Sequence, residues 1–343
     1  MTAATSTADV RRDEISAWSA AALGTGAFAL APASADASFR RYFRITPDPP
    51  WQGHATLIVM DAPPPMEDCR PFVHVAGLLT GAGLHAPQVL AGDPARGFLL
   101  LTDLGALTYL AALDAESAPA LYGDATAALI RWQKATRDGA LPAYDEALLA
   151  RELALFRDWY VGRHLGVALT PAQEQTLAHA FRLILDNNLA QPRVFVHRDY
   201  HSRNLMVARP NPGILDFQDA VTGPITYDLV SLLRDAYVAW EEEQQIDWAV
   251  RYWERARREG LPVGADFGDF WRDFEWMGVQ RQLKVLGIFA RLNHRDGKAA
   301  YLDDMPRVMR YLRAACERYR ALGPLATLID EIEGGARQGA GIA

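Results

Sequence analysis

The sequence predicts an α+β fold of two lobes: a small β-rich lobe over residues 1–103 and a larger, mainly helical lobe over residues 104–333. Within the first hundred residues, short runs rich in β-branched, aromatic or leucine side chains are bounded by Gly, Pro or Asp, which is typical of strands. From Leu107 onward, large apolar residues recur every three or four positions, as they do on helices. A Gly-rich tail over residues 334–343 is expected to be flexible.

The first lobe is predicted to contain five strands and a helix near Arg70–Thr80. The strands are expected at Phe28–Pro32, Phe39–Thr46, Thr56–Asp61, Pro87–Ala91 and Phe98–Thr102. In the second lobe the periodicity predicts helices that include Leu121–Lys134, Asp145–Leu165, Ala172–Leu189 and 279–292. This order, strands first and helices afterwards, indicates an α+β protein rather than a parallel α/β sheet.

The N-terminal segment allows two interpretations. Arg11 and Arg12 precede the uncharged stretch 15–35, which ends in Ala-Ser-Ala, so the segment superficially resembles an export signal. However, Asp13 and Glu14 intervene, and most of the stretch is Ala, Gly, Ser and Thr. We therefore expect an amphipathic helix that ends near Gly24, followed by a strand.

Composition excludes little but sets the context. The net charge of −7 offers no basic surface for a phosphate backbone, so we expect no nucleic-acid partner. The two cysteines, Cys69 and Cys316, are too few for a disulfide framework or a zinc site, which is typical of a cytoplasmic protein. We also expect no membrane association and no obligate protein partner.

The stretch VFVHRDYHSRNLMV (194–207) is an apolar strand that is interrupted by His197, Arg198 and Asp199, then by Asn204, before it becomes apolar again. Buried polar side chains are costly unless they have partners or a function. The spacing, H-R-D followed by four residues and Asn, is that of a kinase catalytic loop. Twelve residues after Asn204 comes Asp216, within GILDFQ.

Phosphoryl transfer requires a carboxylate that orients and deprotonates the acceptor hydroxyl, and oxygen ligands for the Mg²⁺ that binds the phosphates of ATP. Asp199 is the candidate base, and Asn204 and Asp216 are the candidate metal ligands. Any one of these residues alone is better explained as a turn residue that bonds nearby backbone. Their joint occurrence at this spacing favours the catalytic interpretation.

The acceptor is expected to be a small molecule. Between Asp216 and the helical pattern that starts at Tyr227 there is no room for the long segment on which protein kinases hold a peptide. His201 also stands where the catalytic loop of a protein kinase carries a lysine. A compact acceptor site is therefore more consistent with the sequence than a peptide platform.

The motifs HRDYHSRN, ILDFQDA and GPITYDLVSLLRDAY resemble those of the aminoglycoside phosphotransferase-like family of small-molecule kinases. Within this family, DASFRRYFRI (36–45), VMDAPPP (59–65) and VQRQLKVLGIFARLNHRDGK (279–298) resemble the members that act on the anomeric hydroxyl of N-acetylated amino sugars in cell-wall recycling. The likeness covers roughly residues 10–330. It implies a protein-kinase-like bilobal fold, use of ATP and Mg²⁺, an amino-sugar substrate, and a brace of the catalytic loop formed by His197 and Asp228.

Two features of the first lobe depart from the protein-kinase pattern. The glycine-rich phosphate loop is replaced by residues 34–39, where Ser34 and Ser38 are small enough for backbone N–H groups to approach phosphate. The strand 56–61 lacks the usual lysine, and Arg44 on the preceding strand is our candidate for its role, with an exposed strand charge as the alternative. The backbone of the hinge is expected to bind adenine, at Thr102, Asp103 and Leu104.

Candidates for contact with the acceptor come from the catalytic loop, from the residues after the metal-binding acid and from the predicted helix 279–292. They are His201, Gln218, Asp219, Arg281 and Lys284. Lys284 offers a charge for the lactyl carboxylate of N-acetylmuramate, and a solvated or ion-paired helix face is the alternative. Three functions stay open: an anomeric kinase for N-acetylmuramate and N-acetylglucosamine, another small-molecule kinase such as an aminoglycoside-modifying enzyme, and a nucleotide-binding pseudokinase.

Overall fold

The computed structural model describes residues 7–35 and 39–340. Contacts divide the chain into two compact units, which we call the sheet unit (Met1–Thr108 and Leu205–Asp219) and the helical unit (Tyr109–Asn204 and Ala220–Ala343). The sheet unit thus ends five residues beyond the predicted boundary at 103 and also includes a later segment of the chain. That segment contains Asp216, so the candidate catalytic residues are divided between the two units.

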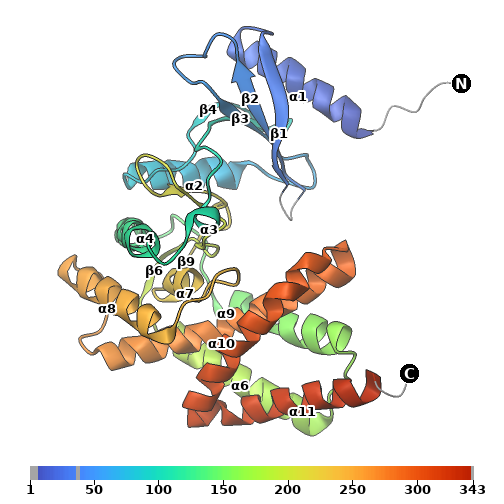
Figure 1. Cartoon of the computed structure of the whole chain (residues 1–343), viewed down its shortest axis with the longest axis vertical. Helices are drawn as coiled ribbons and strands as arrows, with labels where there is room; N and C mark the ends of the chain where they lie inside the picture. The colour runs from blue at the N-terminus through green and yellow to red at the C-terminus, as the bar shows by residue number, and fades with distance from the viewer. Residues whose placement is uncertain (1–6, 36–38, 341–343) are drawn as a thin grey trace, which may run out of the picture. The chain divides into compact units, whose positions relative to one another are not determined.

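The sheet unit contains a five-stranded antiparallel sheet in the order β1-β2-β3-β5-β4 (Figure 1). Its strands are β1 (Phe28–Ala35), β2 (Arg41–Pro47), β3 (Leu57–Asp61), β4 (Val89–Asp93) and β5 (Phe98–Thr102). Each predicted strand is therefore present, with ends that shift by up to three residues. Apolar residues alternate with polar ones along β2, so Phe43 and Ile45 are buried while Arg44 on the other face is half-buried.

Helix α1 (Thr7–Leu23) packs on the sheet and completes its core. Ile15, Trp18 and Leu23 are buried together with residues from β2, β3 and β5. Trp18 also contacts Phe98, with ring centroids 5.6 Å apart. The segment for which an export signal was considered is therefore part of the folded sheet unit.

The later segment of the sheet unit forms a short hairpin of β7 (Leu205–Met206) and β8 (Gly213–Ile214). After β8, Phe217 packs against Phe72 of α2 (Arg70–Gly81), with ring centroids 4.7 Å apart. The backbone N–H of Val207 donates to the carbonyl of Leu107. These contacts position the residues around Asp216 within the sheet unit.

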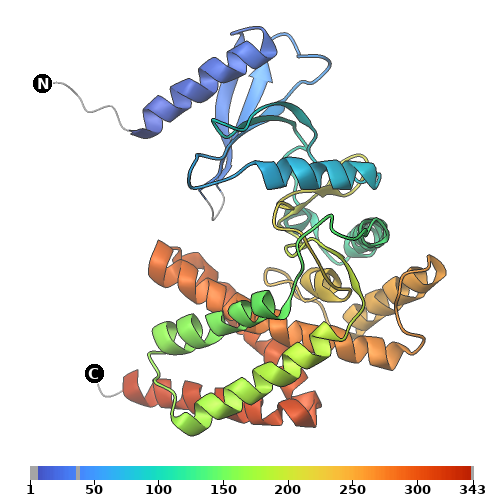
Figure 2. The same ribbon diagram turned by 180° about the vertical axis from the view of Figure 1, so that it is seen from behind.

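The helical unit is built around α9 (Phe267–Asp296), a helix of 30 residues, most of them buried. Other helices of this unit pack against it (Figure 2). The other α-helices of this unit are α3 (Tyr109–Ala112), α4 (Ala118–Lys134), α5 (Glu146–Leu155), α6 (Pro171–Leu189), α7 (Tyr227–Leu233), α8 (Glu242–Arg258), α10 (Met305–Arg318) and α11 (Gly323–Ala340). β6 (Arg193–Val196) pairs with β9 (Val221–Pro224) in a two-stranded antiparallel sheet. The strands position the catalytic loop, since His197 directly follows β6.

Two predictions about the helices need correction. The single helix expected over 145–165 is α5 followed by a π-helical segment, η1 (Phe156–His164). The tail expected to be flexible from residue 334 is helical as far as Ala340, because α11 begins with buried apolar residues, such as Leu325 and Ile329, and continues through the glycines. The predicted α+β kinase-like fold is confirmed.

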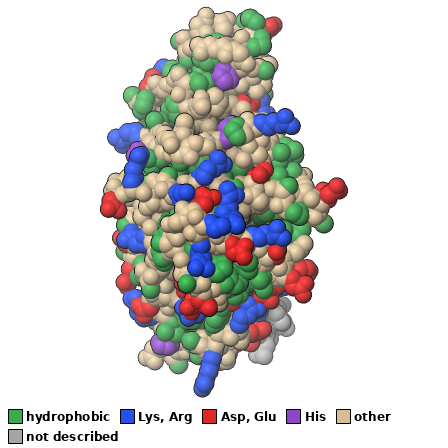
Figure 3. All heavy atoms as spheres, turned by 90° about the vertical axis from the view of Figure 1, so that its left-hand side faces the viewer, with side chains coloured by type: hydrophobic (Ala, Val, Ile, Leu, Met, Phe, Trp, Pro, Cys, Tyr) green, Lys and Arg blue, Asp and Glu red, His purple; other side chains and the backbone are tan. Residues whose placement is uncertain are grey.

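The surface carries both signs of charge. On the face drawn in Figure 3, Lys and Arg side chains lie among Asp and Glu side chains. No helix in residues 7–35 and 39–340 combines the length and the apolar character needed to cross a membrane. Both Cys69 and Cys316 are buried free thiols.

Candidate active site

A buried carboxylate holds the start of the catalytic loop. Asp228, fully buried on α7, accepts hydrogen bonds from the backbone N–H groups of His197 (2.6 Å) and Arg198 (3.0 Å). Arg198 has a φ of +77°, a left-handed conformation that costs a non-glycine residue roughly 1–3 kcal/mol. The two hydrogen bonds help to offset this strain. Burial raises the pKa of Asp228 to about 7, although both N–H groups act in the opposite direction.

The turn that follows places Asp199 and Asn204 together. The carbonyl of Asp199 accepts hydrogen bonds from the backbone N–H of His201 (3.1 Å) and from Nδ2 of Asn204 (3.0 Å). The latter bond identifies which atom of the amide is nitrogen and therefore which is the oxygen available as a ligand. The backbone N–H of Asp199 donates to Nδ1 of His197 at 3.3 Å. The turn is therefore fixed by main-chain contacts, which leaves the carboxylate of Asp199 for chemistry.

Asp199 is half-buried and surrounded by positive charge. Burial alone would raise its pKa, but the charges of Lys284, His201, Arg281 and Arg198 outweigh that effect and lower the pKa to about 2. Asp199 is consequently ionised throughout the neutral range. A carboxylate with this pKa accepts a proton weakly and a hydrogen bond strongly.

A buried ion cluster lies beneath the loop. Glu152 of α5 accepts Nη2 of Arg198 at 2.6 Å and lies 3.0 Å from Nζ of Lys284 on α9, with both distances measured to Oε1. Its other oxygen accepts the hydroxyl of Tyr144, and Nζ of Lys284 also donates to the hydroxyl of Tyr227 at 2.9 Å. Burial would raise the pKa of Glu152, but the charges of Lys284 and Arg198 lower it. Glu152 therefore connects α9 to the H-R-D motif.

Arg281, one turn before Lys284 on α9, is only 5% exposed, and its Nε has no hydrogen-bond partner in the described chain. Its charge nevertheless contributes to lowering the pKa of Asp199 and that of the half-buried His201, for which burial is the larger cause. A buried guanidinium with unused donors is costly. Arg281 is thus placed to donate hydrogen bonds to a molecule near Asp199.

Asp235 ties the second half of the loop to the segment after α7. Its carboxylate accepts the backbone N–H of Ser202 and that of Tyr237, each at 2.9 Å. The ring of Tyr237 in turn packs edge-on against His201, with centroids 5.5 Å apart. The sequence prediction missed both Asp235 and Glu152, although a charged residue inside an apolar helical pattern, as Glu152 is within ALLARELALF, is a detectable signal.

The sheet unit carries the other candidate metal ligand. Asp216 has a φ of +59°, and its Oδ1 accepts Nε2 of Gln218 at 2.8 Å. The nearly buried Arg40 lies 3.9 Å from the same oxygen and 4.0 Å from Glu67. Gln218 therefore contacts Asp216, while Asp219 is exposed. Arg40 is the cation that the structure brings to this carboxylate.

Arg44 is occupied elsewhere. Its Nε and Nη2 bind the two carboxylate oxygens of Asp103 at 2.6 and 3.1 Å, and Nη2 also donates to the carbonyl of Gly105. The guanidinium of Arg44, which the sequence suggested as the phosphate contact, is therefore bound to Asp103 and to the carbonyl of Gly105. The side chain of Asp103 is the carboxylate that holds Arg44 in this position.

The remaining predicted nucleotide contacts are placed as follows. The backbone N–H of Thr102 already donates to the carbonyl of Gln88, whereas no hydrogen bond within the described residues uses Leu104. Ser34 lies at the end of β1, and Ser38 lies outside the described residues. Lys284, which the sequence offered either as a contact for the lactyl carboxylate or as part of an ion-paired helix face, is ion-paired with Glu152.

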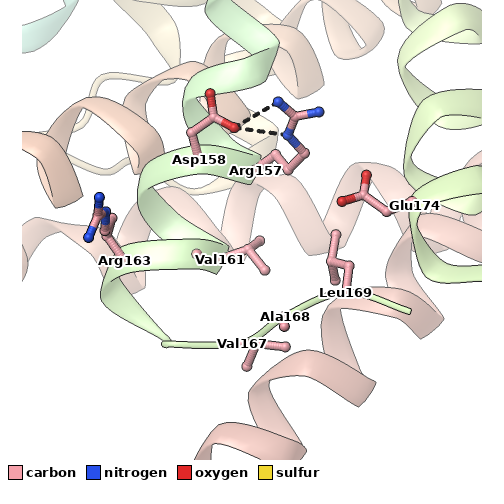
Figure 4. Close-up of a pocket in the computed structure, with 9 residues that line it drawn as sticks. Arg157, Asp158, Val161, Arg163, Val167, Ala168, Leu169 and Glu174 are labelled. Atoms are coloured by element: carbon pink, nitrogen blue, oxygen red, sulfur yellow. Dashed lines mark hydrogen bonds and ion pairs between the residues drawn. The ribbon is translucent and has the colours of Figure 1, made fainter. Parts of the chain in front are cut away.

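A concavity of about 500 Å³ lies elsewhere in the helical unit, between η1 and the start of α6 (Figure 4). Val161 and Leu169 line it, together with Glu174 and the paired Arg157 and Asp158. None of the predicted site residues contributes to it. Among the described residues, no group of three His, Cys, Asp or Glu side chains is arranged to hold a metal ion alone.

The fold and the catalytic loop define a phosphotransferase of the kinase type. A model of the phosphotransferase enzyme family matches residues 29–267, and the chain belongs to this family. It is therefore a kinase, as the sequence motifs predicted, and its family implies use of a nucleotide.

Several curated relatives are similar over most of their length. The N-acetylmuramate/N-acetylglucosamine kinase of Pseudomonas aeruginosa is 55% identical over 311 residues, which cover 90% of this chain and 89% of the relative. The protein of the same name from Neisseria meningitidis is 48% identical, with 90% and 91% covered.

Solved structures share the fold at low identity. The gentamicin complex of APH(2'')-IIa has a TM-score of 0.59 at 14% identity and covers 90% of this chain and 97% of its own. An ethanolamine kinase from Plasmodium vivax has a TM-score of 0.57 at 10% identity, with 84% and 82% covered.

Proposed function

We propose that this kinase uses ATP to phosphorylate the anomeric hydroxyl of N-acetylmuramate and N-acetylglucosamine, and that the sugar 1-phosphates return cell-wall sugars towards UDP-sugar in the cytoplasm. The names of relatives about half identical to this chain support the substrate class. The observation that carries the chemistry is that the charges of Lys284, Arg281 and Arg198 lower the pKa of Asp199, on a turn that also holds Asn204.

In the proposed reaction the C1 oxygen of the sugar attacks the γ-phosphorus. The new oxygen–phosphorus bond forms as the bond between the γ-phosphorus and the bridging oxygen breaks, and ADP leaves with that electron pair. Asp199 accepts the hydrogen bond of the C1 hydroxyl, orients its oxygen and takes the proton late. A pKa of about 2 suits this orienting role better than early deprotonation.

The residues present fit a Mg²⁺–nucleotide complex. The amide oxygen of Asn204 and the carboxylate of Asp216 are hard oxygen ligands, and Mg²⁺ in phosphoryl-transfer sites commonly takes one or two protein ligands together with phosphates and water. When bound, the metal supplies neutralisation of charge on the phosphates. Arg40, beside Asp216, is the proposed phosphate contact, and the backbone of Leu104 is the proposed adenine contact.

The sign of the charge near the base distinguishes this proposal from an antibiotic-modifying enzyme. Arg198, Arg281 and Lys284 are the fixed cations that lower the pKa of Asp199. Arg198 and Lys284 share Glu152, whereas Arg281 has no carboxylate partner in the described chain, and its positive charge disfavours a polycationic aminoglycoside relative to a neutral or anionic sugar. Arg281, with its unused Nε, is the proposed donor to the acceptor.

An assay of ADP release tests the proposal with N-acetylglucosamine, N-acetylmuramate, kanamycin and no acceptor. Turnover with both sugars and not with kanamycin is expected. Phosphorus-31 NMR with ¹³C-labelled N-acetylglucosamine should show phosphorus coupled to C1. Coupling to C6 would overturn the anomeric assignment, and nucleotide binding without turnover would favour a pseudokinase.

Variants of the two aspartates test their roles. Asp199→Asn is expected to keep nucleotide affinity within a few-fold and to lower kcat by a factor on the order of 10²–10⁴. Asp216→Asn should also weaken binding of the Mg²⁺–nucleotide, because it removes a charged ligand. Asp247→Asn, at an exposed position on α8, is the control and should change neither quantity. Equal kcat for Asp199→Asn and the unaltered chain would exclude Asp199 as the orienting group.

A further inference from the structure

Arg203 occupies an unusual position for an exposed arginine of the catalytic loop. Its guanidinium carbon lies 3.6 Å from the ring centroid of Tyr237 and 5.7 Å from that of Tyr301. Both tyrosine rings contact Phe289 of α9, at centroid distances of 6.2 and 5.2 Å. Arg203 is therefore held against an aromatic platform that is anchored to the central helix.

This guanidinium has no acidic partner in the described part of the chain, and stacking on a ring face leaves its in-plane N–H donors unused. Of the other arginines in and next to the loop, Arg198 is paired with Glu152. Arg281 is the second arginine here without a carboxylate partner. Burial raises the pKa of Tyr237, and the charges of Arg203 and Arg281 both act to lower it. Two unpaired guanidinium groups thus lie near one tyrosine.

The sequence position of Arg203 relates it to the reacting group. It lies four residues after Asp199 and directly before Asn204, on a turn closed by the hydrogen bond from the Asn204 N–H to the His201 carbonyl. Asp199 and Arg203 therefore belong to one short turn, and an acceptor that brought its C1 hydroxyl to Asp199 would lie beside that turn. N-acetylmuramate differs from N-acetylglucosamine by a lactyl group, which carries a carboxylate.

We propose that Arg203, clamped by Tyr237 and Tyr301, binds the lactyl carboxylate and sets the preference between the two sugars. This inference rests on the function proposed above and names its specificity determinant. A planar guanidinium matches a carboxylate with two parallel hydrogen bonds, and a stacked guanidinium is pre-organised for that geometry. Lys284, the earlier candidate, is committed to Glu152 and Tyr227.

The test compares kcat/KM for N-acetylglucosamine, N-acetylmuramate and the methyl ester of N-acetylmuramate. The unaltered chain should prefer the acid to its ester, which keeps the lactyl bulk but loses the charge. Arg203→Gln should lower the ratio of kcat/KM for N-acetylmuramate to that for N-acetylglucosamine by a factor on the order of 10–100, the scale of a charge-assisted hydrogen-bonded pair. Arg203→Gln should also make kcat/KM for N-acetylmuramate similar to kcat/KM for its methyl ester. Arg203→Lys keeps the charge but loses the two parallel N–H donors, so its ratio of kcat/KM values should lie between those of the unaltered chain and Arg203→Gln.

Arg258→Gln, an exposed arginine on α8, is the matched control and should leave the ratio unchanged. The inference is overturned if Arg203→Gln lowers kcat/KM for all three sugars equally, or if the unaltered chain does not distinguish acid from ester. The latter comparison needs no variant and so does not depend on folding of a variant. Failure of the unaltered chain to phosphorylate either sugar would instead overturn the proposed function, and this inference with it.

Discussion

Replacement of Glu152 by glutamine tests the buried ion cluster beneath the catalytic loop. The substitution keeps the shape of the side chain but removes the negative charge that Lys284 and Arg198 share. Both cations would then be left without their common partner. Lys284 is only 6% exposed, so water cannot replace the lost carboxylate there.

The distances give the size of the effect. At an effective dielectric constant of about 20, the contact of 3.0 Å to Lys284 and that of 2.6 Å to Arg198 correspond to roughly 5–6 kcal/mol of attraction each. The desolvation of three charged groups opposes this attraction. Loss of one partner from a buried ion pair costs about 3–5 kcal/mol, and we expect Glu152→Gln to lower the free energy of unfolding by that amount.

Urea denaturation followed by tryptophan fluorescence measures the loss, and a double-mutant cycle identifies its cause. Lys284→Met in the Glu152→Gln background removes one of the two stranded cations, so the double variant should be less destabilised than the sum of the single variants by at least about 1 kcal/mol. Additive losses, or a loss below about 1 kcal/mol for Glu152→Gln, would refute the cluster as a source of stability.

The pH dependence of the unfolding free energy tests the same ion cluster independently. The pKa of Glu152 is lowered in the folded chain, since the charges of Lys284 and Arg198 outweigh the effect of burial. Its contribution to stability is therefore present above the unfolded pKa of about 4.3 and is lost as the pH falls through the folded value. The difference in unfolding free energy between the unaltered chain and Glu152→Gln should shrink below about pH 4.

Two further predictions concern packing and the loop brace. Gly287→Ala should lower the free energy of unfolding by about 3 kcal/mol in urea denaturation, because a Cβ there would lie 2.3 Å from the backbone carbon of Leu155. Gly278→Ala on the same helix, where the nearest atom is Nη1 at the tip of the Arg234 side chain at 3.2 Å, should cost less than about 1 kcal/mol, because a shift of a few tenths of an ångström relieves that contact; equal losses would contradict this account. Asp228, with a pKa of about 7, retains a proton that the unfolded chain loses near pH 4, so its contribution to stability falls as the pH rises between these values. The unfolding free energy of the unaltered chain minus that of Asp228→Asn should fall by about 2 kcal/mol from pH 5 to 7, and a constant difference would show that the carboxylate is ionised throughout.

Local sequence signals predict the five strands of the sheet and the tight turn that carries Asp199 and Asn204, but not the π-helical segment η1. The strand boundaries follow Gly, Pro and Asp, and α6 begins at a capping box in which Thr170 and Gln173 bond each other's backbone N–H. Asp199 and Asn204 lie in one tight turn, where Asn204 donates to the carbonyl of Asp199, and the sequence can indicate such a turn because its residues are local; their catalytic roles stay a prediction.

Charge pairing over long sequence separation could not be predicted in the same way. Arg40 and Arg44 look equivalent on one strand, but only the fold brings Asp103 to Arg44 and Asp216 to Arg40. The sequence around Lys284 does not reveal its partner, because Glu152 lies 132 residues away and only the fold brings the two side chains together. A pattern of residues along a helix shows which side chains share a face, while the partner of each charge depends on the tertiary structure.

The position of α9 links the electrostatics of Asp199, the proposed base, to the proposed choice of acceptor. Lys284 and Arg281 lie three residues apart on this helix, and both lower the pKa of Asp199. Lys284 contributes more than Arg281 to that lowered pKa but is paired with Glu152, whereas Arg281 has no carboxylate partner within the described chain. A cation with unused donors favours an acceptor that brings hydrogen-bond acceptors or negative charge, and it simultaneously keeps Asp199 ionised. A substitution at Arg281 should therefore change acceptor affinity and the ionisation of the base together, while one at Arg203 should change acceptor preference alone.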